Sequence, residues 1–172
     1  CSAGCVFCCH LRVMATPAEV FGLLDYLRQS LDADAFAAFE ARVAAAAERI
    51  GGLDREQLLA TNLACPVLVD GRCAGYPARP FNCRAYHSLD RSACERSFAE
   101  PSNPTLGHPQ FTQVTRANEG LQSGFIAALG EAGYDNRQVE LVSALAEALA
   151  DPEARRRFLA RGPAFLRESP RL

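Results

Sequence analysis

The chain has 172 residues, of which 49% are hydrophobic and 22% are charged, and its formal net charge is −2. This length is enough to bury an apolar core, so we expect the fold not to depend on metal alone. The small net charge argues against general attraction to nucleic acid or anionic membranes. No run approaches the roughly 20 apolar residues of a membrane span, and the start lacks a signal-peptide pattern, so a cytoplasmic location is expected.

Two long helices are predicted between residues 16 and 50. The sequence Thr-Pro-Ala-Glu at 16–19 has the form of a helix start with a capping box, and apolar residues follow at helical spacing over 20–31. A second apolar stripe covers 36–50, and Gly51-Gly52 is expected to end that helix in a left-handed conformation. Together the two helices are predicted to form an antiparallel hairpin.

Shorter elements are predicted in the next fifty residues. Asp54 can cap a short helix that reaches about residue 62. Within the run 65–73, Asp70-Gly71 favours a hairpin turn with positive φ angles, which would put the first and last cysteines of the run on neighbouring strands. The prolines in 77–83 indicate an irregular loop, and Asp90 can start a further short helix.

The remainder of the chain is predicted to be helical. The proline-bearing segment 99–113 is expected to connect a cysteine-bearing region, 1–98, to a helical region, 114–172, that packs on it in one compact domain. Apolar spacing in the last region predicts three helices, marked by 121–129, 142–149 and a start at Asp151-Pro152. The expected fold class is mainly α, a helical bundle with an irregular cysteine-rich metal-binding region and one short β-hairpin.

Eight cysteines are the candidate metal ligands: Cys1, Cys5, Cys8, Cys9, Cys65, Cys73, Cys83 and Cys94. Four of them fall within the first nine residues. Thiolates at two-residue spacing can bind one ion from a turn, and distant thiols can complete a tetrahedral shell. The expected cofactor is Zn²⁺ or iron, including a [4Fe–4S] cluster, because each of these can be held by four thiolates. Eight thiols would suffice for two centres, with the adjacent Cys8 and Cys9 serving different ones.

Two other uses of these cysteines compete with metal binding. Disulfide frameworks belong mainly to small secreted domains, and a bridge between adjacent cysteines would be strained. Thiol–disulfide exchange at Cys5-x2-Cys8 belongs to a thioredoxin-like βαβ setting, which is not apparent here. The leading hypothesis is a metal-binding protein, in metal handling or as an accessory module. The alternatives are an iron–sulfur redox or electron-transfer component and a disulfide-stapled extracytoplasmic protein.

Several basic groups accompany the cysteines. His10 and His87 are expected to lie beside the metal site or on the surface, and not to bind the metal directly. Arginine N–H groups can donate to thiolate sulfur. For the flanking Arg12 and Arg72, an ordinary surface position is the simpler interpretation. For Arg79 and Arg84, a surface position and a role beside the thiolates are equally well supported. No phosphate loop, nucleophile elbow or metalloprotease signature is present, so no catalytic constellation is recognised and whether the protein is an enzyme stays open.

A resemblance to a known family runs through the motifs Cys1-x3-Cys5-x2-Cys8-Cys9, Cys65-Pro66-x-Leu68, Asp70-Gly71-x-Cys73, Tyr76-x2-Arg79-Pro80-x2-Cys83-Arg84 and Cys94. Residues 1 to about 96 resemble the bacterial YkgJ-type cysteine-cluster family, which is described as a zinc- or iron-chelating domain with a CxxCxxCC motif. The first spacing is three residues in this chain instead of two. The resemblance implies metal binding and no established reaction. A related domain in flagellin lysine methylases is associated with an iron–sulfur cluster, but no cofactor site for methylation is recognisable here.

Overall fold

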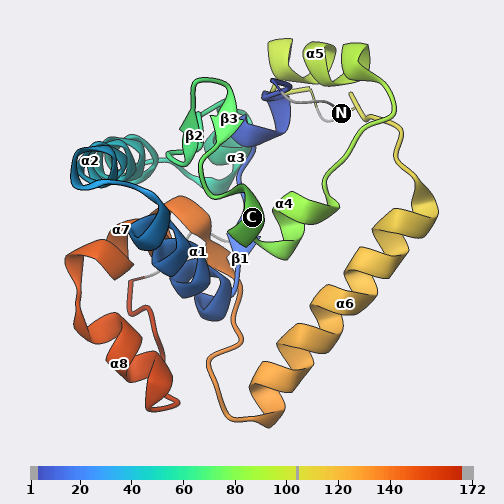
Figure 1. Ribbon diagram of the computed structural model, residues 1–172. Coiled ribbons are helices and arrows are strands. Elements are labelled where there is room, and N and C mark those ends of the chain that lie inside the picture. The colour runs from blue at the N-terminus through green and yellow to red at the C-terminus, as the bar shows by residue number, and fades with distance from the viewer. Residues whose placement is uncertain (1–3, 104, 168–172) are drawn as a thin grey trace.

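A computed structural model describes residues 4–103 and 105–167 of the chain, and these residues are mainly helical, as predicted (Figure 1). Their α-helices are α1 (Pro17–Ser30), α2 (Ala33–Ile50), α3 (Arg55–Leu59), α4 (Phe81–Ala85), α5 (Arg91–Ala99), α6 (Thr112–Glu131), α7 (Leu141–Ala150) and α8 (Glu153–Leu159). The short elements are the 3₁₀ helices η1 (Phe7–His10) and η2 (Tyr76–Ala78) and the strands β1 (Met14–Ala15), β2 (Leu68–Val69), β3 (Arg72–Cys73) and β4 (Val139–Glu140). No helix in the described ranges is both long and apolar enough to cross a bilayer.

The predicted start of α1 is confirmed in detail. The Thr16 hydroxyl accepts from the backbone N–H of Glu19 at 3.4 Å, and Glu19 Oε2 accepts from the backbone N–H of Thr16 at 2.7 Å, which is a complete capping box. Asp32 caps α2 in a related way, since its Oδ1 accepts from the backbone N–H of Ala35 at 2.8 Å. Local sequence therefore determines where both long helices begin.

Two expectations about these helices are wrong. Gly51 has φ −64° and continues the right-handed turn, donating its N–H to the carbonyl of Ala47 at 2.9 Å, so α2 does not end in a left-handed glycine. The two helices also diverge after the extended residue Leu31 instead of packing along each other as a hairpin (Figure 1). Helix α7, from the far end of the sequence, packs against both of them.

The principal apolar core lies where α1, α2 and α7 meet. Leu27 of α1, Phe39 of α2 and Leu145 of α7 are each fully buried there, at 0% exposure. Phe158 of α8 joins the same core. Residues from both halves of the sequence thus share one interior, and the segment 99–113 does not divide the chain into separately cored parts.

Two small antiparallel sheets complete the fold. The predicted hairpin is confirmed as β2 and β3, and its turn residues Asp70 and Gly71 have φ angles of 48° and 73°. Cys73 lies on β3, but Cys65 precedes β2, so only one of the two cysteines lies on a strand. The second sheet pairs β1 with β4 and was not predicted from sequence.

The segment expected to be an irregular loop instead contains η2 and α4. Two hydrogen bonds anchor α4 to the core side of the molecule, because Phe81 N donates to Glu19 Oε1 at 2.7 Å and Asn82 Nδ2 donates to the carbonyl of Met14 at 2.6 Å. These contacts with α1 and β1 hold the segment in a helical conformation, which the prolines in its sequence did not indicate. Cys83 is consequently carried on a short helix.

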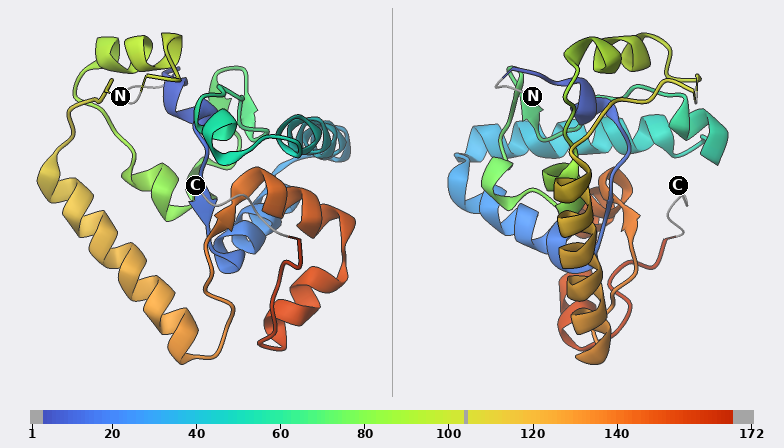
Figure 2. Two further views of the ribbon diagram at one scale, coloured as in Figure 1. Left: turned by 180° about the vertical axis from the view of Figure 1, so that it is seen from behind. Right: turned by 90° about the vertical axis from the view of Figure 1, so that its right-hand side faces the viewer.

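Helix α6 lies along one side of the molecule, and its main contact is with α4 (Figures 1 and 2). The rings of Phe81 and Phe125 meet there with centroids 5.5 Å apart. Leu121 and Val114 are exposed on this helix, at 65% and 49%. The helix thus supports α4 without contributing a fully buried side chain to the core.

Candidate metal centre

Backbone pairing brings the N-terminal cysteines beside Cys65. Cys8 and Cys9 lie in η1, and the carbonyl of Cys9 accepts from the backbone N–H of Cys65 at 2.7 Å. The carbonyl of His10 accepts from the backbone N–H of Leu63 at 3.3 Å in the same ladder. Two segments that are distant in sequence are thereby held side by side.

Two further elements contribute Cys73 from β3 and Cys83 from α4. The thiols of Cys8, Cys9, Cys65, Cys73 and Cys83 are close enough to alter one another's pKa values, and we call these five residues the thiol cluster. All of them are half-buried. The fold therefore gathers thiols from four separate stretches of chain into one neighbourhood.

The cluster environment favours protonated thiols at most positions. Burial raises the pKa of Cys65 to about 11 and that of Cys83 to about 12, where neighbouring thiols add to the effect. Burial also raises the pKa of Cys73. Side-chain hydrogen bonding between the adjacent Cys8 and Cys9 raises the pKa of Cys8 and lowers that of Cys9. Cys9 is thus the cluster member whose thiolate its surroundings stabilise.

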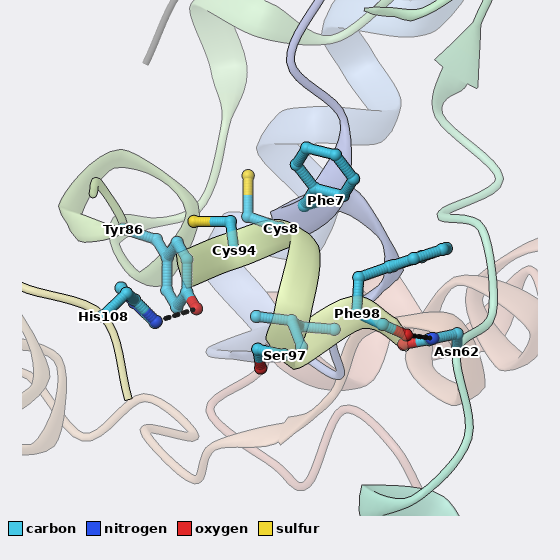
Figure 3. Close-up of a pocket in the computed structure, with 9 residues that line it drawn as sticks. Phe7, Cys8, Asn62, Tyr86, Cys94, Ser97, Phe98 and His108 are labelled. Carbon is cyan, nitrogen blue, oxygen red and sulfur yellow. Dashed lines mark hydrogen bonds between the residues drawn. The ribbon is translucent and has the colours of Figure 1, made fainter. Parts of the chain in front are cut away.

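The three other cysteines differ in their placement. Cys94, on α5, lines a cavity of about 20 Å³ together with Cys8, Tyr86 and His108, and its side chain lies between those of Tyr86 and Cys8 (Figure 3). Burial raises the pKa of Tyr86 to about 12, with smaller contributions from these two thiols. Cys5 lies just ahead of η1 and is half-buried. Cys1 lies outside the described residues.

The described thiols do not form a finished coordination shell. Within residues 4–103 and 105–167, no three Cys, His, Asp or Glu side chains are arranged as ligands of one metal ion. The seven cysteines in those ranges are all unpaired. The donor chemistry of the cluster suits zinc, iron or an iron–sulfur cluster, since each prefers thiolate ligands.

The histidines near the cluster have other partners. His87 Nε2 accepts from the backbone N–H of Phe111 at 2.8 Å, and its Nδ1 lies 2.8 Å from the carbonyl of Ala85, so both ring nitrogens are engaged. His10 Nδ1 lies 3.0 Å from the carbonyl of Val6. These contacts give both rings partners within the protein.

Two of the flanking arginines lie differently from each other. Arg79 packs over the ring of Tyr76 at 3.5 Å from its centroid, and its charge opposes the pKa increases of Cys8, Cys73 and Cys83. Arg84 instead donates to backbone carbonyls, including that of Arg79 at 2.7 Å. Arg79 therefore acts electrostatically on the cluster, whereas Arg84 braces the loop that carries Arg79.

Arg12 departs from the surface position expected for it. Only 4% of its side chain is exposed, and Nη1 lies 3.7 Å from Glu140 Oε1. Arg72 is exposed, as expected. The sequence pattern around Arg12 contains no sign of this burial, because its anionic partner lies in β4, at the far end of the chain. Glu140 was likewise not identified from sequence.

No protein-family model, curated protein or solved structure matches this chain.

Proposed function

We propose that this protein binds a metal ion, zinc or iron, through the thiol cluster. The observation that carries the proposal is the convergence of five cysteines from η1, β3, α4 and the segment before β2, none of them paired in a disulfide. Four soft donors are enough for a closed tetrahedral site. The motif resemblance to the YkgJ-type family supports the same chemistry for the same residues.

The electrostatics of the cluster supply a second argument. Several thiols are buried where their charged forms are disfavoured, and the nearby cation Arg79 acts on three of them. A bound divalent cation would provide the missing positive charge and make the thiolates stable at neutral pH. Metal binding would release protons, so affinity should fall as the pH is lowered.

Roles can be assigned within this proposal. The cluster thiolates would bind the ion, and Arg79 would balance the excess negative charge of more than two thiolates. Cys94 and Cys5 would act as additional ligands or neighbouring thiols, since Cys94 shares a cavity with Cys8. A site closed by protein ligands favours binding or structural support over turnover.

Anaerobic purification followed by metal analysis and visible spectroscopy tests the proposal. We expect zinc or iron at a substantial fraction of one equivalent or more, lost in a variant carrying Cys65→Ser and Cys83→Ser. Colourless protein with zinc supports a mononuclear zinc site, whereas brown protein with iron and acid-labile sulfide supports the iron–sulfur alternative. Protein that contains no metal, and that binds none when zinc or iron is added under reducing conditions, would contradict the proposal.

A further inference from the structure

Arg12 is a buried cation with incomplete hydrogen bonding. Its Nη2 donates to the carbonyl of Leu63 at 2.6 Å and to that of His10 at 3.4 Å, within the ladder that joins Cys9 to Cys65. Its Nε and Nη1 are buried and have no hydrogen-bond acceptor among the described residues. A guanidinium remains charged in proteins, and burying its donors without acceptors is unfavourable. The structure therefore leaves part of this group available to an additional acceptor.

Two acidic groups act on this guanidinium. Glu140, with a side chain only 1% exposed, holds Oε1 3.7 Å from Arg12 Nη1. Its other oxygen accepts from the backbone N–H of Ser143 at 2.8 Å and so caps α7. Cys65 is the second group, and its interaction with Arg12 opposes the decrease that burial causes in the arginine pKa. Arg12 is thus shared between the cysteine-bearing region and the helix α7 of the core.

The two charged neighbours influence Cys65 in opposite directions. The pKa of Cys65 is raised mainly by burial, and in addition Glu140 raises it while Arg12 lowers it. Glu140 is the anion that lies against Arg12 in this structure, with Oε1 3.7 Å from Nη1. A Cys65 that binds metal as a thiolate would be a second anion competing for the same buried cation.

We propose that Arg12 is a positioning residue of the metal centre, the counter-cation of the Cys65 thiolate, and that Glu140 weakens metal binding by competing for it. This inference rests on the metal binding proposed above and adds a regulatory element to it. Arg12 fixes the backbone on both sides of the cluster through two carbonyls, and its unsatisfied N–H groups can donate to a sulfur acceptor. Glu140 links this balance of charge to the N-terminus of α7.

A purely structural ion pair makes a different prediction. Loss of either partner would then disturb the same contact and weaken metal binding in the same direction. Competition for one cation predicts opposite effects on metal affinity. Removing Arg12 removes the counter-charge of the Cys65 thiolate, whereas neutralising Glu140 frees Arg12 to balance that thiolate. Glu140→Gln is the appropriate change, since glutamine keeps a side-chain oxygen that can cap Ser143 N–H.

The test is an anaerobic cobalt(II) titration of the full chain, followed by the sulfur-to-cobalt charge-transfer absorption. Arg12→Met should weaken cobalt binding by about 10- to 100-fold, the usual range for lost outer-shell partners. Glu140→Gln should strengthen binding by up to about tenfold, because a like charge near the thiolate is removed. Arg42→Met is the matched control, since Arg42 donates from Nε to the carbonyl of Pro66 at 2.9 Å, beside Cys65, and should leave the affinity unchanged.

The possible outcomes separate this inference from the proposed function. If the parent protein gives no cobalt–thiolate absorption, metal binding itself fails and the role of Arg12 fails with it. If the parent binds cobalt but Glu140→Gln binds it equally or more weakly, the competition is overturned whether or not Arg12→Met folds. Arg12→Lys keeps the charge and should recover most of the parent affinity, and failure to do so in a folded variant would also contradict the role as counter-cation.

Discussion

The apolar core and the thiol cluster are stabilised in different ways. The core is formed where the helices α1, α2 and α7 meet, with side chains such as Leu27 and Leu145 fully buried. The cluster is formed by η1, β3 and α4, of which none exceeds five residues, and its thiols are only half-buried. Burial of apolar surface is sufficient for the first region, whereas the second depends on backbone hydrogen bonds and on anchors to the first.

This difference indicates where a metal ion would act. The core has few polar groups to satisfy and should fold without metal. The cluster brings together thiols whose charged forms are disfavoured, held by segments too short to be stable alone. A metal ion would therefore stabilise the cluster region mainly, and changes in the two regions should have separable effects on stability and on metal binding.

The largest effect on stability is expected in the core. Leu145→Ala should lower the free energy of unfolding by about 2–5 kcal/mol, because the substitution leaves a cavity at the contact of α7 with α1 and α2. Urea denaturation of the metal-free protein measures this change. Leu121→Ala on the exposed face of α6 is the matched control, and it should change the free energy by less than about 0.5 kcal/mol. Equal effects of the two substitutions would mean that α7 does not form the core.

The next effect is an alkaline loss of stability that originates in the cluster. Since folding raises the pKa of Cys65 from its ordinary 9.0 to about 11, the folded state favours the protonated thiol. Its contribution is fully present below pH 9 and is lost as the pH rises through 11, at up to about 1.4 kcal/mol per pH unit. Urea midpoints of metal-free protein between pH 8 and pH 11 should therefore fall, and less steeply in Cys65→Ser. An identical pH dependence in the parent and in this variant would contradict the burial of Cys65.

A smaller effect should appear at the junction between the two regions. Glu19 completes the capping box of α1 and also accepts from Phe81 N at the start of the helix that carries Cys83. Glu19→Ala should lower the free energy of unfolding by about 1–2 kcal/mol through the lost cap and anchor. It should also weaken cobalt binding, because α4 loses one of the two hydrogen bonds that hold it to α1 and β1.

Asp54→Ala provides the comparison for Glu19→Ala. Asp54 forms a similar capping box at the start of α3. Neither hydrogen bond of this box reaches α4. Its loss should lower stability by about 1 kcal/mol and leave cobalt affinity at the parent value. If Glu19→Ala also leaves cobalt affinity unchanged, the core does not position Cys83 through this contact.

Local signals made much of the fold predictable. The cap residues Thr16 and Asp54 and the turn Asp70-Gly71 act within a few residues, and each was correctly assigned from sequence. The pairing of β1 with β4 was not, because a two-residue strand has no alternation to detect. The helix at Cys83 was also missed, since its anchors Glu19 and Met14 lie far away in sequence.

The candidate site was predictable in its composition and less so in its arrangement. The clustering of cysteines in the first part of the chain identified the residues, but only the fold shows that five of them converge while Cys94 lies against Tyr86. The position of Arg12 could not be derived, because burial of a charged residue depends on a partner from another element. Long-range contacts of this kind leave no local pattern in one sequence.

Protection of the cysteines by zinc is the sharpest measure of whether the thiol cluster forms one shared metal centre. The native, reduced protein is alkylated with and without zinc, and each cysteine is quantified by mass spectrometry of its peptides. We expect zinc to protect at least four of Cys8, Cys9, Cys65, Cys73 and Cys83 together, and a chelator to reverse the protection. Alkylation of these residues at the same rate with and without zinc, or protection of each at a different zinc concentration, would contradict a shared metal centre.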